Sequence, residues 1–359
     1  MQSEQVACGG SVAESQLAQP GQYKDRIRRE LTALYTWPSL LALAVRPLRD
    51  LSAVMDINKL ADVAAAINRG NQLSFAIISR EYLQTGLNWI CAMQRLGLKN
   101  FIIIAGDRVT CEILDERGVP NVGAIIDESE FDTSFVSSTG FSAKGLAVSA
   151  FKFPVTHFLV KTGYDVVMSD ADAVWLRDPV PYLRDADVAF QRIVYHPPAI
   201  ASQWGFAACG GFNAFRGGVK TTAFLERCVQ ENRILFDDQV VLNLALLDED
   251  PHWHCEHPDW TLPSRQNDRS ALETAFARCA NAPIRGDLKT SGLQLLALPH
   301  DKFWRHAFVS TPVRDMVVCH PNSPKDDLEK MQLLDVMGLR FQSASPVFPG
   351  TEEHGRPAV

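Results

Sequence analysis

Two aspartates separated by one residue follow an apolar run in the stretch GYDVVMSDADAVWLRDP, residues 163–179. The apolar residues 166–168 lead to Asp170 and Asp172, and the small Ala171 stands between these acids. This pattern predicts a buried strand that ends by presenting two carboxylates. Such carboxylates suit a hard divalent cation, which takes oxygen ligands and often shares them with substrate phosphates. We therefore expect Asp170 and Asp172 to bind a metal ion, Mn²⁺ or Mg²⁺.

The Asp-x-Asp pattern alone also fits a turn or a helix start. Asp178-Pro179, in the same stretch, has the residues of an ordinary helix start, with Asp as the N-cap and Pro at the first helical position. The apolar lead-in favours the metal interpretation for Asp170 and Asp172, because a buried strand seldom runs into two acids that lack a partner.

Other acids also stand where an element begins or ends. Asp107 follows the apolar run FIIIAG, residues 101–106, and is either a ligand-binding group or the N-cap of the next helix. Asp237 and Asp238 open the apolar segment FDDQVVLNLALL, where helix capping is again the alternative. The sequence leaves both alternatives open.

The glycine pair Gly210-Gly211 and a histidine near the end of the chain also merit attention. Gly210 and Gly211 permit a close approach of a ligand to the backbone, although a bulge or a turn is the commoner explanation for such a pair. His320 ends the apolar run MVVCH and is a candidate ligand, with a hydrogen-bonded surface histidine as the alternative.

The segment PHWHCEH places His252, His254, Cys255 and His257 close together. Imidazole and thiolate are zinc ligands, but this spacing fits no common structural zinc site. Four such neighbours do not easily converge on one tetrahedral ion, so a polar loop is the favoured interpretation.

The elements that must position these groups alternate between apolar strands and helices. A break is expected near Pro154, in the helix predicted over 144–161. Predicted strands are 73–79, 101–106, 122–126 and 187–194, besides the strand before Asp170; predicted helices are 85–96, 111–117, 144–161, 221–230 and 236–247.

Strands that are apolar on both faces and alternate with helices predict an α/β fold. Its sheet is expected to be mostly parallel and Rossmann-like, with helices on both faces. Ligands bind such sheets beyond the carboxyl ends of the strands, where Asp107, Asp170 and Asp172 are expected. We expect a helical N-terminal leader over residues 1–70, with helices at 24–35 and 58–67, then one domain over 71–340 and a tail over 341–359.

The composition limits the classes of protein that the chain can represent. It has 359 residues, 46% of them hydrophobic, which is enough for a substantial core. The net charge of -7 argues against a nucleic-acid-binding protein. No run approaches the ~20 apolar residues of a membrane span, and no signal peptide is visible in the first residues. The compartment is therefore left open.

Several motifs occur in a fixed order, and as a set they resemble a known family. The ordered set is Asn88-Trp89, Gly106-Asp107, GYDVVMSDADAVWLRDP, GGFNAF, DDQVVLN and His320-Pro321-Asn322. It resembles the nucleotide-diphospho-sugar transferases of glycosyltransferase family 77, which include plant xylosyltransferases and arabinosyltransferases, and more distantly the glycogenin-like transferases. The resemblance implies a GT-A fold and a Golgi location, although no anchor is visible and a cytoplasmic protein is equally consistent with the sequence.

The resemblance also implies a reaction. The expected reaction is metal-dependent, retaining transfer of a sugar of the xylose, galactose or arabinose class. The donor is a UDP-sugar, and the acceptor is a hydroxyl of a glycan or glycoprotein.

Matching the motifs residue by residue assigns a role to each position. Asp170 and Asp172 hold the ion, usually Mn²⁺, and His320 completes its ligand set. Asp238 and Gln239 form the catalytic pair beside the sugar. The donor-binding residues implied are Ser79, Arg80, Asp107, Asp170, Ala171, Asp172, Gly211, Asn213, Lys325 and Lys330.

One departure concerns the lysine that grips the diphosphate in this family. The family has a lysine just after the histidine segment, whereas here Lys325 comes early and Lys330 comes late, with Asp326 and Asp327 between them. The sequence leaves three alternatives open: Lys325 has the role, Lys330 has it, or neither does. Ser323 also replaces an aromatic residue expected after the histidine segment.

Two alternatives stand beside the transferase. The first is a phosphatase of the haloacid dehalogenase class, in which Asp170 is the nucleophile and Asp172 the acid and base. That class carries its motif at the start of the domain, whereas several predicted strands precede Asp170. The second alternative is a catalytically silent module that binds a nucleotide sugar, suggested only by the altered lysine spacing.

Overall fold

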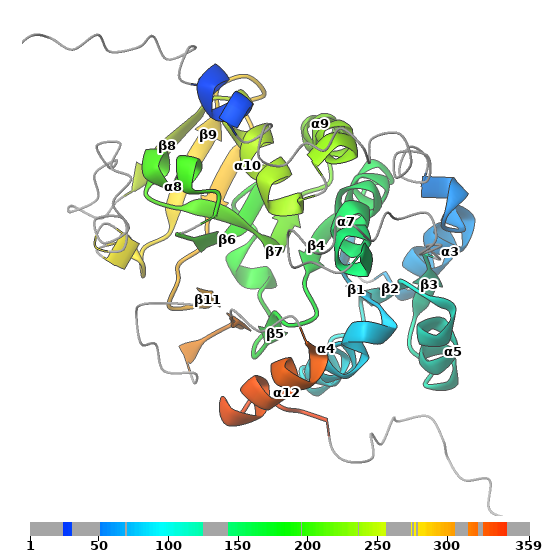
Figure 1. Ribbon diagram of the computed structural model, residues 1–359. Coiled ribbons are helices and arrows are strands. Elements are labelled where there is room, and N and C mark those ends of the chain that lie inside the picture. Colours follow the sequence, from blue (N-terminus) through cyan, green and yellow to red (C-terminus); the bar gives the residue numbers. More distant parts are fainter. Residues whose placement is uncertain are drawn as a thin grey trace, which may run out of the picture.

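The computed structural model describes a large part of the chain (Figure 1). The described residues are 24–30, 51–68, 70–124, 143–194, 196–235, 237–255, 274, 276–277, 279–305, 315–321 and 326–342. Outside these residues lie Lys325 and most of the predicted tail. The C-terminal ends of the helix predicted at 24–35 and of the strand predicted at 122–126 lie outside them as well.

A nine-stranded sheet forms the centre of the described part of the chain, in the order β3-β2-β1-β4-β7-β6-β10-β9-β8. Its strands are β1 (Gln72–Ile78), β2 (Phe101–Ala105), β3 (Asn121–Gly123), β4 (Asp165–Ser169), β6 (Val188–Ile193), β7 (Ala207–Phe215), β8 (Pro251–Cys255), β9 (Ile284–Leu288) and β10 (Gln294–Ala297).

The first half of the sheet confirms the predicted α/β pattern. Neighbouring strands in the row β3-β2-β1-β4 are parallel, and helices follow β1 and β2 along the chain. Strands β1 and β2 are buried almost throughout, as parallel strands covered on both faces must be. The carboxyl ends of β1, β2 and β4 therefore meet at one edge of the sheet.

Beyond β4 the sheet is mixed. Strand β7 runs antiparallel to both β4 and β6, and its register with β6 shifts around Phe190 and Arg192. The segment of Gly210 and Gly211, which the sequence also allowed to be a turn or a bulge, thus lies within β7. The shift in register between β7 and β6 falls in this segment. Strands β8 and β9 fall in a stretch that the sequence left unassigned, because their polar, proline-bearing surroundings hide the alternation of buried and exposed residues.

Helices cover both faces of the sheet, as predicted (Figure 1). On one face pack α3 (Ile57–Ile67), α7 (Ala143–Lys161), α9 (Val219–Leu235) and α10 (Asp238–Asp248). On the other face pack α4 (Leu83–Arg95) and α5 (Arg108–Glu116). None of the helices in the described residues has the length and apolar character needed to cross a membrane.

Helix α7 passes through Pro154 as one helix, so the predicted break is wrong. Proline has no N–H, and it therefore leaves the carbonyl four residues earlier, that of Ala150, without its helical donor. The side-chain amide of Asn232 on α9 donates to that carbonyl over 2.6 Å. This tertiary hydrogen bond compensates for the loss, and no local sequence pattern reveals it.

A second, three-stranded sheet lies at the edge where β4 ends. It contains β5 (Val174–Trp175), β11 (Phe303–Arg305) and β12 (Val318–His320), with β12 between the other two. Trp175 packs edge-on against Trp89 of α4 and Phe212 of β7. Because β5 follows the two aspartates directly, pairing of β12 with β5 brings His320 to them.

Helix α12 (Asp327–Val336) is held against α4 by its own first residue. The Asp327 carboxylate accepts hydrogen bonds from the backbone N–H groups of Gln84 and Thr85, at 2.8 and 3.0 Å. Asp326 caps α12 by accepting from the N–H of Glu329. The two acids that interrupt the lysine spacing therefore position a helix.

Candidate functional site

The turn after β4 is fixed by backbone and side-chain hydrogen bonds. The Asp170 N–H donates to the Gly211 carbonyl over 2.7 Å, and the Ala173 N–H donates to the Asp170 carbonyl over 3.1 Å. The Trp175 indole N–H donates to the Ser169 hydroxyl. The positions of both carboxylates therefore follow from the end of a buried strand.

His320 faces both carboxylates. Its Nε2 lies 3.2 Å from Asp172 Oδ1 and 3.8 Å from Asp170 Oδ2. One ligand atom from each of these three residues falls within 4.8 Å of the others. His320 and Asp172 are buried, so the cluster is shielded from bulk water. The sequence predicted these three residues as one ligand set, and the structure brings them together.

The orientation of the His320 ring is set by Gln191 of β6. The Gln191 side-chain Nε2 donates to the Trp304 carbonyl over 2.8 Å, which leaves its Oε1 as an acceptor. That oxygen lies 3.0 Å from His320 Nδ1, so Nδ1 carries a proton. In the neutral ring Nε2 then presents its lone pair toward two carboxylates. A cation or a second proton at Nε2 relieves that repulsion, and partners of this kind orient metal-binding histidines.

Gly211 lines the cluster and leaves room for it. A Cβ at this position would lie 2.1 Å from His320 Cε1 and 2.6 Å from Asp170 Oδ2. Only glycine fits between these two side chains, so the absence of a Cβ at Gly211 is a requirement of the structure. Gly210 is equally crowded, because its Cβ would lie 2.3 Å from Asp238 Oδ2.

Lys152 of α7 is a central residue that sequence reasoning missed. Its ammonium lies 2.6 Å from Asp170 Oδ1 and 2.7 Å from Asp238 Oδ2. Burial disfavours its charge, but the two carboxylates outweigh that effect and raise the pKa of Lys152. A charged residue inside the apolar run of this helix was the available signal.

Lys330 of α12 contacts the second aspartate. Its ammonium lies 2.5 Å from Asp172 Oδ2 and 5.3 Å from the centre of the Tyr82 ring. Burial alone would raise the pKa of Asp172, yet Lys330 and His320 hold that pKa well below its usual range. Asp172 is therefore ionised and able to bind a cation.

The start of α10 supplies the predicted catalytic pair. Asp237 caps the helix by accepting from the Val240 N–H, which leaves Asp238 in the first turn, where it also accepts from the Ser149 hydroxyl. Burial raises the pKa of Asp238 although Lys152 lowers it. The Gln239 side chain accepts from the Gly210 N–H and donates to the His196 carbonyl. Both polar groups of Gln239 are thus bound to backbone.

Ser79, Arg80 and Asp107 gather at the ends of β1 and β2. Asp107 is the N-cap of α5, accepting from the Thr110 N–H, and it also accepts from the Arg80 N–H over 2.6 Å. The contacts of Asp107 are therefore those of a helix N-cap, which is one of the two roles that the sequence left open for it. The Ser79 hydroxyl is buried and has no hydrogen-bond partner among the described residues.

Asn213 lies within β7, opposite Met168 of β4 in the strand register. It is fully buried, and neither its Oδ1 nor its Nδ2 has a hydrogen-bond partner in the described part of the chain. A buried amide without a partner costs about 1–3 kcal/mol, so a polar ligand that paired with Asn213 would recover free energy of that order.

The site fits a divalent cation. Two carboxylates and one imidazole of fixed tautomer converge from two sheets, and the glycine allows His320 and Asp170 to approach each other. Oxygen ligands together with imidazole suit Mn²⁺ or Mg²⁺. Asp170, Asp172 and His320 are therefore the residues that would hold the ion.

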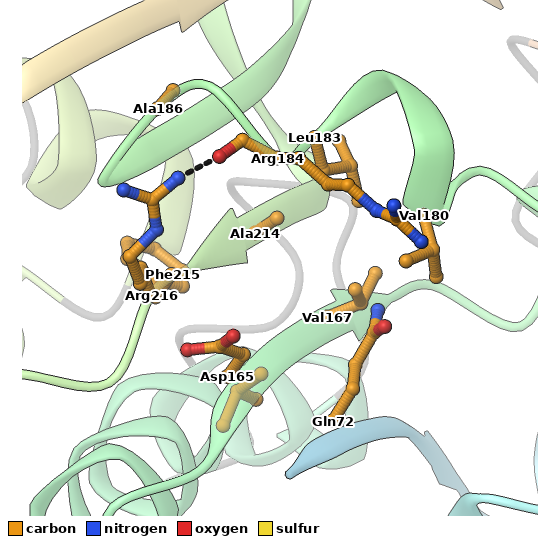
Figure 2. A pocket seen from close by; sticks show the side chains of 11 residues that line it. Gln72, Asp165, Val167, Val180, Leu183, Arg184, Ala186, Ala214, Phe215 and Arg216 are labelled. Atoms are coloured by element: carbon orange, nitrogen blue, oxygen red, sulfur yellow. Dashed lines mark hydrogen bonds between the residues drawn. The ribbon is translucent and has the colours of Figure 1, made fainter. Parts of the chain in front are cut away.

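A separate pocket lies at the opposite end of β4 (Figure 2). Gln72, Asp165, Arg184 and Arg216 are among its lining residues, and none of the predicted site residues lines it. The Arg216 guanidinium donates to the Arg184 carbonyl, and Asp165 accepts from the Gly217 N–H. The Arg216 guanidinium and the Asp165 carboxylate in this pocket therefore already have hydrogen-bond partners within the protein.

The predicted residues thus divide into three groups. Those that converge on one cluster are Asp170, Ala171, Asp172, Gly211, Asp238, Gln239, His320 and Lys330. Asn213 lies beside this cluster in β7, and the group of Ser79, Arg80 and Asp107 lies at the same edge of the sheet. Lys325 lies outside the described residues.

The chain is similar to a family model and to several known proteins. A model of the nucleotide-diphospho-sugar transferase family matches residues 96–334. Beta-arabinofuranosyltransferase RAY1 of Arabidopsis thaliana is 29% identical over 130 residues, which is 36% of this chain and 23% of that protein. Arabinosyltransferase RRA2 of the same plant is 32% identical over 100 residues, 28% of this chain and 22% of that protein.

Two further comparisons are more limited. Arabinosyltransferase XEG113 of Arabidopsis thaliana is 33% identical over 105 residues, covering 28% of this chain and 16% of that protein. The solved structure of mouse xyloside xylosyltransferase 1, in its apo form, superposes with a TM-score of 0.32 at 10% identity, covering 49% of this chain and 82% of that chain. The chain matches less than a quarter of the length of each of the three plant relatives.

Because the family model matches most of the chain, the chain belongs to the nucleotide-diphospho-sugar transferase family. The predicted family is therefore confirmed, and so, at the level of that family, is the prediction of a glycosyltransferase.

Proposed function

We propose that this chain is a metal-dependent, retaining glycosyltransferase that moves a sugar from a UDP-sugar to a hydroxyl of a glycan or glycoprotein. The observation that carries the proposal is the convergence of Asp170, Asp172 and His320, with ligand atoms within 4.8 Å of one another. The plant relatives are named arabinosyltransferases, which favours a donor of the pentose class. We propose residues 71–340 as the catalytic unit.

In this proposal the two carboxylates and His320 would hold Mn²⁺, and such an ion would supply positive charge that offsets the charge of the donor diphosphate. The chain's own lysines then have different roles. Lys152 is bound between Asp170 and Asp238, so it keeps both acids in place. Lys330 contacts Asp172 and comes from α12 at the edge of the fold, so it is the lysine proposed to exchange that contact for a phosphate oxygen.

The sugar is proposed to lie beside Asn213 and the start of α10. Asn213 offers a donor and an acceptor that have no partner among the described residues, which suits sugar hydroxyl groups. Gln239 and Asp238 are the proposed catalytic pair. The bond between the anomeric carbon and the diphosphate oxygen breaks, the acceptor oxygen bonds to that carbon on the same face, and its proton passes to the departing phosphate.

The test is release of UDP from a panel of UDP-sugars, without acceptor, in Mn²⁺ and in EDTA. Slow release from one donor, stopped by EDTA and absent in Asp172→Asn, is expected. Asp178→Asn is the matched control, because Asp178 is an exposed acid of the same stretch and only caps the turn at Val180. An Asp172→Asn enzyme that works as well as the wild type contradicts the proposal.

The two alternatives give different results in the same experiment. Release of phosphate from p-nitrophenyl phosphate with Mg²⁺ identifies the phosphatase. UDP binding detected by calorimetry, without turnover of any donor, identifies the silent module. Family membership favours neither result, because it concerns nucleotide-diphospho-sugar transferases.

A further inference from the structure

The edge formed by β8 and β9 carries two histidines on one face. Successive residues of a strand point to opposite faces. Trp253 is buried, and the flanking His252 and His254 are exposed. In the antiparallel register His252 lies opposite Asp287 of β9. The segment is therefore a strand that presents two imidazoles and a carboxylate together, where the sequence favoured a polar loop.

The three side chains are close enough to share one ion. His254 Nε2 lies 3.1 Å from Asp287 Oδ1, and His252 Nδ1 lies 3.7 Å from the same oxygen. The two imidazole centroids are 4.2 Å apart, and one ligand atom from each residue falls within 4.8 Å of the others. Tetrahedral zinc with bonds of about 2.0–2.1 Å places its ligand atoms about 3.3 Å apart. Small side-chain rotations bring all three residues to that geometry.

We propose that His252, His254 and Asp287 form a second metal site, for a borderline transition metal such as Zn²⁺. Two imidazoles with one carboxylate favour Zn²⁺, Ni²⁺ or Cu²⁺, whereas the carboxylate-rich site at Asp170 suits Mn²⁺ or Mg²⁺. Three protein ligands leave at least one position for water or another ligand. This proposal does not depend on the transferase reaction.

Neighbouring charges are compatible with such a site. Arg285 lies opposite His254 in the strand register, but its guanidinium faces Asp185 at 3.5 Å. The strand pairing fixes the backbones of all three ligands, so only side chains need to move. The third ligand comes from a strand distant in sequence, which is why the local spacing of the histidines fitted no common zinc site.

The test is the number of Zn²⁺ ions bound, measured by competition with a chromophoric chelator. Wild type is compared with His254→Ala and Asp287→Asn, both surface changes in an exposed cluster. Loss of one bound Zn²⁺, or a fall in its affinity of about tenfold or more, is expected in each variant. His157→Ala removes an imidazole on α7 and should leave the count unchanged.

Cu²⁺ EPR gives a second readout, since nitrogen couplings count the imidazoles that bind the ion. The wild type should show a signal with two nitrogens that His254→Ala reduces to one, whereas the site at Asp170 offers a single imidazole. Equal Zn²⁺ counts with unchanged affinity in wild type and both variants, or the absence of a two-nitrogen signal, overturns the proposal. Either result is independent of whether the enzyme transfers a sugar.

Discussion

Replacing Gly211 by alanine tests the metal site by a steric change that alters no charge. The added Cβ would lie 2.1 Å from His320 Cε1, whereas ordinary contact begins at 3.4 Å, so the ring must retreat by 3.4 − 2.1 = 1.3 Å. A metal site tolerates departures of only about 0.2 Å in its ligand distances. His320 also cannot retreat freely, because Gln191 holds its Nδ1 and β12 holds its backbone.

The expected result is a fall in Mn²⁺ affinity of at least about 10–100-fold, the range observed when groups that orient metal ligands are removed. Overpacking should lower the free energy of unfolding by about 1–3 kcal/mol, which leaves the protein folded. The assay is EPR of free Mn²⁺ during titration, with UDP release measured at saturating Mn²⁺.

The matched control is Gly218→Ala. Gly218 has nothing within 4 Å of a built Cβ and is exposed, so this variant adds the same methyl group without a contact. Wild-type Mn²⁺ affinity in folded Gly211→Ala would refute the placement of the ion between His320 and Asp170. Equal losses in the two glycine variants would show that the effect is general and would refute it as well.

Two predictions concern stability, measured by urea denaturation. Lys152→Met should lower the free energy of unfolding by about 3–5 kcal/mol, because it removes the cation beside the buried Asp238 and the half-buried Asp170. Adding Asp238→Asn should restore part of that loss, and Lys161→Met, at the exposed end of α7, is the control. No recovery in the double variant would contradict the pairing. Burial lowers the pKa of His300 from 6.5 to about 4. Between these two pH values the unfolded chain binds a proton that the folded chain does not. The free energy of unfolding should therefore fall by up to about 3 kcal/mol as the pH drops from 6.5 to about 4. His300→Gln should flatten this dependence, and an unchanged slope would show that other groups cause it.

The sequence predicted the parallel half of the fold well, because each strand and helix there is indicated by one continuous run of residues. The runs before Gly106 and Asp170 are apolar without interruption, and strands covered on both faces require such runs. Strand β7 was harder to identify, since its small residues Gly210 and Gly211 are typical of turns and its register shift breaks the alternation of faces. The second sheet was not predictable, because β5 and β11 have two and three residues.

The candidate site was predictable where one motif supplies the chemistry. Asp170, Asp172 and His320 were named from motifs, but only the pairing of β12 with β5 shows how the histidine reaches the acids. The choice between the two lysines also depended on tertiary structure: Asp327 docks α12 on α4, and Lys330 then reaches Asp172. Spacing along the chain could not supply that information.

The charges of buried residues indicate part of the site that the motifs missed. A buried acid needs a partner, so Asp238 requires a cation from another element, and the half-buried Asp170 shares that cation. Lys152, a lone charge within the apolar run Ala150–Val155, is the residue that such a search would find. The same search would also find Arg192 in β6, whose guanidinium instead donates to carbonyls, among them that of Leu298. A lone buried charge in a sequence therefore indicates a required partner, and the structure decides whether that partner is a site acid or the backbone.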